Sequence, residues 1–231
     1  AKAILIDIEE DTFGLDFELV QKAIKKFRPK VLQLVHVYGF PARDTLKIVK
    51  LCKKKNIKII EDTSESLGAK LNNKIVGTFG DINVTSIRSE KMIGVGEGAV
   101  ISTSNKSTFN NISLLASRAA PFRKSTDPYW KKYYVIGEGY NYLMPHLLGS
   151  IARAQIERFN KELLKKKINV GKNYFRILKK KNLSFGQKLI KNSKPVFWLN
   201  SVLFNKSSKN KVRDLGKKLK KRGIEVRSGF W

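Results

Sequence analysis

The chain has 231 residues, which is enough to bury a sizeable core, and its hydrophobic content of 42% is ordinary for a globular protein. No apolar stretch approaches the roughly 20 residues of a membrane span, and the N-terminus lacks a signal-peptide pattern. A cytoplasmic protein without a membrane partner is therefore expected. The single cysteine, Cys52, excludes a disulfide within the chain, and its apolar neighbours predict a buried structural thiol.

The formal net charge of +28 suggests a nucleic-acid partner. The lysines, however, come in short scattered runs beside apolar residues at helical spacing, and they outnumber the arginines that phosphate recognition favours. No zinc-knuckle spacing, RNA-binding strand signature or DNA-reading helix motif accompanies them. We expect a lysine-rich solvated surface with no specific nucleic-acid partner, and a non-catalytic basic nucleic-acid-binding protein is the alternative.

The first part of the chain alternates apolar runs with amphipathic segments, as is typical of an α/β domain. The connections are long enough for crossovers, which favours a mostly parallel sheet covered on both faces. The last two strands are so close in sequence that the pair can include an antiparallel member. We expect strands at 3–8, 31–37, 57–60, 81–87 and 98–103, and helices at 15–27 and 43–55.

After Pro145 the pattern changes to a long core-facing helix, which is followed by a strand at 195–204, a helix at 209–222 and a strand at 224–227. The predicted division is a large domain at 1–160 and a small α+β domain at 161–231. Because the chain starts on alanine and stops soon after the last strand signal, both domains are expected to be incomplete at their outer ends.

Polar residues stand at the ends of two expected strands, where ligands of parallel sheets collect. Residues 61–65 (Glu-Asp-Thr-Ser-Glu) follow the strand at 57–60, and residues 86–91 end the strand at 81–87. If these strands are neighbours, Asp62 and Lys91 open into one crevice. Spacing alone favours a plain salt bridge between them over a catalytic pair.

Five segments stand in a recognisable order: His-Val-Tyr-Gly-Phe-Pro at 36–41, residues 61–69, Gly-Thr-Phe-Gly-Asp at 77–81, residues 86–98 with their serine, lysine and glycines, and residues 139–157. Together they resemble the DegT/DnrJ/EryC1/StrS family of sugar aminotransferases, with 127–144 most similar to its perosamine-synthase branch. The resemblance implies the aspartate-aminotransferase type of fold, a three-layer α/β domain with a mostly parallel sheet, followed by part of a small α+β domain.

The resemblance also implies pyridoxal 5'-phosphate as cofactor. Lys91 would carry it through a primary amine and shuttle a proton, and Asp62 would keep the pyridine nitrogen protonated. Ser86 would bind the phosphate, whereas Asn141 would reach the phosphate in a neighbouring subunit, which implies a homodimer with shared active sites. Glu65 stands beside the ring where the family usually has glutamine, and its carboxylate would repel the phenolic oxygen unless it is protonated or turned away.

The implied reaction moves an amino group, from glutamate, to a nucleotide-linked 4-keto-6-deoxy sugar in surface-polysaccharide or deoxysugar biosynthesis. The alternative inside the family is a dehydratase with the same cofactor, but those relatives replace the lysine with histidine, so Lys91 favours the aminotransferase. Leu143 and Ala99 depart from the family's usual arginine and glycine, and its N-terminal glycine-threonine phosphate loop has no counterpart. The two histidines lack a third ligand at metal spacing, so no metal site is expected.

Overall fold

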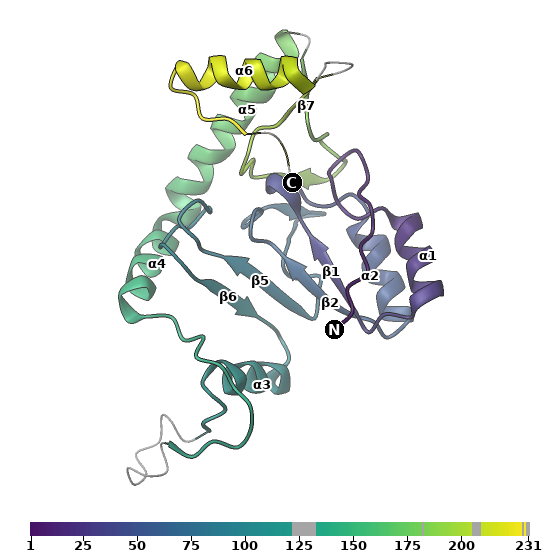
Figure 1. The fold of residues 1–231 in the computed structure, drawn as a ribbon, viewed down its shortest axis with the longest axis vertical. Helices are drawn as coiled ribbons and strands as arrows, with labels where there is room; N and C mark the ends of the chain where they lie inside the picture. Colours follow the sequence, from purple (N-terminus) through teal and green to yellow (C-terminus); the bar gives the residue numbers. More distant parts are fainter. Residues whose placement is uncertain (122–132, 182, 205–208, 228, 230–231) are drawn as a thin grey trace.

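The computed structural model describes residues 1–121, 133–181, 183–204, 209–227 and 229. Its centre is a four-stranded sheet in the order β1-β2-β5-β6 (Figure 1). The strands β1 (Val31–Val35), β2 (Lys58–Asp62) and β5 (Ile82–Ser86) are parallel, and β6 (Ala99–Ser102) pairs antiparallel with β5. The predicted α/β class, with one antiparallel strand in a mostly parallel sheet, is confirmed.

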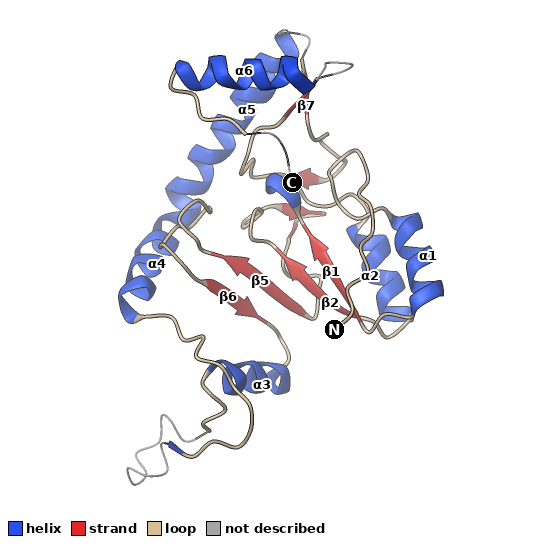
Figure 2. Cartoon of the chain, viewed as in Figure 1, coloured by secondary structure: helices blue, strands red, loops and turns tan. Residues whose placement is uncertain are grey.

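Two helices, α1 (Phe17–Phe27) and α2 (Thr45–Lys54), lie beside β1 and β2 (Figure 2). The first begins where the Asp16 carboxylate accepts the backbone N–H of Leu19 at 2.9 Å, an ordinary N-cap. Cys52 is fully buried in the core between helices and sheet, and burial raises the pKa of its thiol, in agreement with a structural role. This core contains Val20, Ile24, Leu32, Leu34, Ala42, Ile48, Cys52, Ile57 and Ile59.

A long helical segment lies on the β5 and β6 side of the sheet, away from α1 and α2 (Figure 2). It consists of α4 (His146–Arg158), a π-helical turn (Phe159–Leu163) and α5 (Leu164–Lys180). Because the segment runs through residue 160, the division into 1–160 and 161–231 remains a prediction. No helix in the described parts of the chain has the length and apolar character needed to cross a bilayer.

The remaining elements are small. The helix α6 (Lys209–Lys221) confirms the expected helix at 209–222, whereas α3 (Lys106–Ala116) was not predicted. Short antiparallel pairings complete the structure: β3 (Lys70–Leu71) with β4 (Lys74–Ile75) and β8 (Ser193–Lys194), and β7 (Ser184–Phe185) with β9 (Val202–Leu203).

Two strand predictions at the ends of the described chain are wrong. Residues 3–8 form only an isolated bridge between Ile8 and Leu15, because no neighbouring strand in the described residues accepts their backbone hydrogen bonds. Residues 224–227 form no strand either. Gly223 takes a left-handed φ of +76°, and the next residue, Ile224, donates its N–H to Leu219 O at 3.0 Å. This hydrogen bond caps the C-terminus of α6.

The strand expected at 195–204 is reduced to β9. Pro195 has no N–H to donate, and Phe197 takes a left-handed φ of 54° that ends any extended run. The Val196 N–H donates to Gly39 O at 2.9 Å, so this segment crosses the turn that follows β1.

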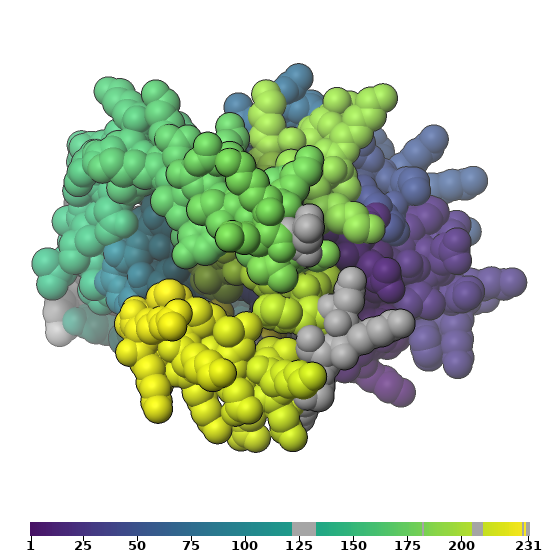
Figure 3. Space-filling model, turned by 90° about the horizontal axis from the view of Figure 1, so that it is seen from above, coloured from purple at the N-terminus to yellow at the C-terminus, as the bar shows by residue number. Residues whose placement is uncertain are grey.

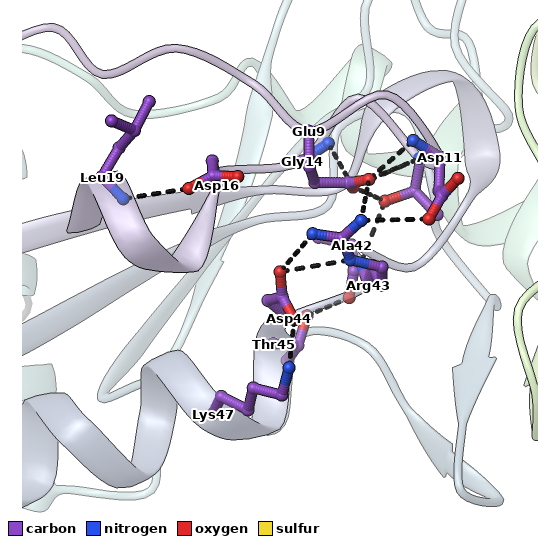
Figure 4. Close-up of polar contacts among 11 residues, drawn as sticks. Glu9, Asp11, Gly14, Asp16, Leu19, Ala42, Arg43, Asp44, Thr45 and Lys47 are labelled. Atoms are coloured by element: carbon purple, nitrogen blue, oxygen red, sulfur yellow. Dashed lines mark hydrogen bonds and ion pairs between the residues drawn. The ribbon is translucent and has the colours of Figure 1, made fainter. Parts of the chain in front are cut away.

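The Arg43 guanidinium ties the loop before α1 to the start of α2 (Figure 4). Its Nη2 lies 2.8 Å from Asp44 Oδ2, and its Nη1 lies 3.0 Å from Asp11 Oδ2 and 3.5 Å from the buried Glu9 carboxylate. Burial by itself raises the pKa of Asp44, but hydrogen bonds from Arg43 and Lys47 outweigh it and leave this pKa below its ordinary value.

A buried carboxylate, Glu61, fixes the end of β2. Its side chain is fully excluded from solvent, yet both oxygens are satisfied. The N–H of Gly77 donates to Oε1 at 2.5 Å, and the N–H groups of Phe79 and Gly80 donate to Oε2 at 2.8 and 2.9 Å. The turn at 77–80 is therefore held against β2 by one side chain.

The same carboxylate holds the end of β1 through His36. The Ala42 N–H donates to His36 Nδ1 at 2.9 Å, so the imidazole proton lies on Nε2, which is 2.9 Å from Glu61 Oε1. Burial alone raises the pKa of Glu61, but the hydrogen bonds from His36 and from the backbone of Gly77 and Gly80 lower it overall. Glu61 is consequently a charged acceptor in the core.

Replacing Glu61 with glutamine should destabilise the protein by about 3 kcal/mol, because an amide NH₂ would face backbone donors and leave buried groups without a partner. Urea unfolding at pH 7 measures this loss. Glu97→Gln, at a carboxylate whose side chain is 75% exposed, is the matched control and should change stability little. Equal stabilities of the two variants would contradict the role given to Glu61.

The Glu61 network also predicts a pH dependence. Because its folded-state pKa is lowered, Glu61 contributes stability that is fully present above the unfolded-state pKa of about 4.3 and is lost as the pH falls through the folded-state pKa. The difference in unfolding free energy between the wild type and Glu61→Gln should therefore shrink as the pH falls below about 4.3. A difference that stays constant down to pH 3 would contradict this.

Candidate active site

Lys91 lies in the loop that joins β5 to β6, and this loop is fastened to α4. Gln155 holds it from two sides, because Gly94 N–H donates to Gln155 Oε1 at 3.1 Å and Gln155 Nε2 donates to Gly94 O at 2.7 Å. Apolar packing joins the loop to the helical segment through Ile87, Ile93, Val95, Ala152 and Phe159. The lysine is thus presented by a loop that rests on a helix.

The amine of Lys91 is held between a carboxylate and an aromatic ring. Its Nζ lies 3.5 Å from Glu65 Oε1 and 4.0 Å from the centre of the Trp198 ring, and only 12% of the side chain is exposed. The other Glu65 oxygen accepts the Tyr38 N–H at 2.9 Å, and Trp198 Nε1 donates to Glu90 O at 2.8 Å. Three segments far apart in sequence therefore meet at this amine.

Gly39 makes the approach of Trp198 possible. A Cβ on Gly39 would lie 2.5 Å from the backbone N of Trp198 and 2.7 Å from that of Phe197, and its φ of +95° is one that other residues avoid. The segment around Trp198 can cross here only because residue 39 has no side chain.

The strand ends place Asp62 and Ser86 on neighbouring strands. Asp62 Oδ1 accepts the Ser64 N–H at 2.9 Å, and Ser64 Oγ accepts the Ser86 N–H at 3.0 Å, so one short turn joins the two positions. Gln33 on β1 contacts the other Asp62 oxygen at 3.4 Å. The ion pair expected between Asp62 and Lys91 is made by Glu65 instead.

Asn141 lies apart from this group within the chain. It forms an isolated bridge with Ser117, just after α3, and its neighbours Tyr140 and Tyr142 stack with ring centres 5.1 Å apart. Both rings are exposed. The geometry therefore brings together Lys91 and Glu65, and Asp62 and Ser86 through Ser64, but not Asn141.

Sequence reasoning missed several residues of the site. Ser64 belongs to the segment that drew attention to Asp62, and Gln155 belongs to a segment similar to the family, so the sequence could have suggested both. Gln33 and Trp198 gave no signal, because a polar residue within a strand and an aromatic residue in an apolar run are ordinary features of a core.

The side chains of the site are a primary amine, carboxylates and serine hydroxyls. An amine can attack a carbonyl carbon, a carboxylate can pair with a protonated ring nitrogen, and hydroxyls can bind phosphate. In the described parts of the chain no three His, Cys, Asp or Glu side chains are grouped to hold a metal. The imidazole of His36 is already engaged by Glu61 and Ala42.

Known proteins resemble the whole chain. GDP-perosamine synthase of Escherichia coli O157:H7 is 30% identical over 234 residues, which is 100% of this chain and 60% of that protein. Among solved structures, PseC of Helicobacter pylori, an aminotransferase involved in the biosynthesis of pseudoaminic acid, has a TM-score of 0.86 at 22% identity and covers 99% of this chain and 59% of its own.

A third similarity is to the E. coli GDP-4-keto-6-deoxy-D-mannose-3-dehydratase with bound hydrated PLP, at a TM-score of 0.80 and 25% identity, covering 96% of this chain and 58% of that one. The chain thus spans about 60% of the length of the curated relatives it matches. The family model of the DegT/DnrJ/EryC1/StrS aminotransferases matches residues 1–231, and the chain belongs to that family.

Proposed function

We propose that this chain forms the cofactor-binding part of a pyridoxal 5'-phosphate-dependent sugar aminotransferase, with Lys91 as the residue that carries the cofactor. The observation that carries the proposal is the Lys91 amine, enclosed by Glu65 and Trp198 in the loop that follows β5. In a member of this family, a covalently held cofactor is expected on an amine that lies in a loop at the carboxyl edge of the sheet.

The residues present suit this cofactor. When bound, it would supply a ring that accepts electron density from the carbon that loses its proton. Lys91 would hold it covalently and, once released, carry a proton on Nζ. Asp62 would keep a proton on the ring nitrogen, and Ser86 would donate its hydroxyl to the phosphate, beside Ser64, whose hydroxyl accepts the Ser86 N–H.

Glu65 has a distinct part in the proposal. Because one oxygen is fixed by the Tyr38 N–H, the other is directed at Lys91 Nζ, so the carboxylate is turned to the amine. An ammonium is no nucleophile and must lose a proton before it can attack a carbonyl. We infer that Glu65 accepts this proton, and that the neutral acid formed in this way no longer repels the phenolic oxygen of the cofactor.

The proposed substrates are a nucleotide-linked 4-keto-6-deoxy sugar, as the perosamine-synthase relatives suggest, and glutamate as the amino donor. The dehydratase relative is the competing function. Lys91 favours the aminotransferase, since by the family resemblance the dehydratases have histidine at this position.

A homodimer with shared active sites completes the proposal. Asn141 bridges Ser117, and no hydrogen bond among the described residues joins it to the Lys91 group; the exposed stacked rings of Tyr140 and Tyr142 beside it suit an interface with a second copy. Asn141 would then bind the phosphate of the partner's cofactor. The cytoplasmic location expected from the sequence remains part of this proposal.

Borohydride treatment of the protein with pyridoxal phosphate should fix the cofactor on Lys91, because reduction makes the bond to the amine permanent. Peptide mass mapping identifies the labelled residue. Lys91→Ala should abolish the label, and Lys106→Ala, at the first residue of α3, should leave it unchanged. A label that maps mainly to another lysine would refute the assignment.

Asp62→Asn should retain the borohydride label but lower the rate of amino transfer by at least about 100-fold, because the ring nitrogen loses the charge that keeps it protonated. The rate is measured with glutamate and a GDP-linked 4-keto-6-deoxy sugar, by mass detection of the aminated product. Asp214→Asn on the exposed surface of α6 serves as the control. Near-normal turnover in Asp62→Asn would remove Asp62 from the mechanism.

A further inference from the structure

A hollow of about 300 Å³ lies between the Lys91 loop and α5. Figure 3 shows the molecule from above, with α5 drawn in green and α6 in yellow. One wall carries Lys91 and Trp198 of the site described above. The other wall is made by residues of the helical segment that the proposed function does not use: Leu163, Lys166, Lys167 and Val170.

Lys167 is the unusual member of this second wall. Its side chain is partly buried, and among the described residues no hydrogen bond or ion pair engages its amine. Burial lowers the pKa of Lys167, and no charged group in the described parts of the chain offsets that effect. By contrast, the neighbouring Lys166 is exposed and lies 2.6 Å from Glu162 Oε1.

The other charged groups that line the hollow are already paired. Lys91 is bound to Glu65 at 3.5 Å, and the Glu90 carboxylate lies 3.6 Å from Arg88 Nη1. The rest of the lining is apolar, from Met92, Leu163, Val170 and Trp198. An ammonium withdrawn from water without a counter-charge is unfavourable, and apolar walls strengthen its attraction for an anion. The missing counter-charge is therefore best supplied by a ligand.

We propose that Lys167 forms an anion subsite that binds the diphosphate group of the nucleotide-sugar substrate. The inference rests on the proposed function, because it places the substrate next to Lys91. A lysine ammonium is a compact charge that suits phosphate oxygens. The cofactor's own phosphate is assigned to Ser86, at the end of β5 and in contact with Ser64, whereas Lys167 faces the hollow from α5.

The test compares ligand binding by the cofactor-loaded protein and its variants, with GDP as the probe and guanosine as its phosphate-free partner. Lys167→Met should weaken GDP binding at least about tenfold, the effect of losing one charge-assisted contact, and should leave guanosine binding unchanged. Lys167→Arg keeps the charge and should stay within about threefold of the wild type. Lys172→Met, at an exposed lysine of the same helix, is the matched control and should bind GDP normally.

Several outcomes would overturn the subsite. These are equal GDP affinity in Lys167→Met and the wild type, an equal loss for GDP and guanosine, or no GDP binding by the wild type. A second arm compares pyridoxal phosphate with pyridoxal: if Lys167→Met selectively weakens the phosphorylated form, the subsite belongs to the cofactor phosphate and the substrate assignment is wrong. If Lys167→Met does not fold, the pair Lys167→Arg and Lys167→Gln decides the question in the same way.

Failure of this inference and failure of the proposed function give different results. Borohydride labelling of Lys91 needs no nucleotide, so it reports on the cofactor alone. A protein that is labelled at Lys91 but binds GDP independently of Lys167 keeps its proposed function and loses the subsite. A protein that binds GDP through Lys167 but takes no label loses the aminotransferase proposal.

Discussion

The buried charge of Glu61 is the constraint on which the site depends. One carboxylate accepts hydrogen bonds from the turn at 77–80 and from the imidazole that ends β1, so two separate segments are fixed to the end of β2. A charge in the core is tolerated only when its acceptor capacity is filled, and here the donors come from two different parts of the chain. Asp62 and Glu65, one and four residues after Glu61, take their positions from this arrangement.

The amine of Lys91 reaches Glu65 from the loop between β5 and β6. Its loop is the tip of an antiparallel hairpin whose two strands belong to the sheet, and Gln155 ties that tip to α4. Functional side chains are most accurately placed when rigid elements support them. The carboxylates are supported by the sheet and the lysine by a helix, and the ion pair of Glu65 with Lys91 joins the two supports.

The elements that could be predicted from the sequence are those whose signal is local. The periodic apolar faces of α1, α2 and α6 and the short strand patterns of β1, β2 and β5 were recognised because the pattern of a regular element repeats along the chain. Residues 3–8, 195–204 and 224–227 carry similar apolar runs, but a strand also requires a partner, and that information lies elsewhere in the chain. The order of the motifs predicted Lys91, Asp62 and Ser86 as site residues. It did not reveal that Glu65 pairs with Lys91, that Trp198 covers it, or that Lys167 has no partner among the described residues.

The absence of a side chain at Gly39 has a consequence for how this site tolerates change. Gly39 contributes no polar atom to the chemistry, yet any larger residue there would displace the backbone that carries Trp198 and so uncover Lys91. A substitution at this position is expected to act like a change in the candidate site, although an inventory of reactive groups would omit it. The space available to a crossing backbone therefore constrains residue 39 as strictly as chemistry constrains the lysine.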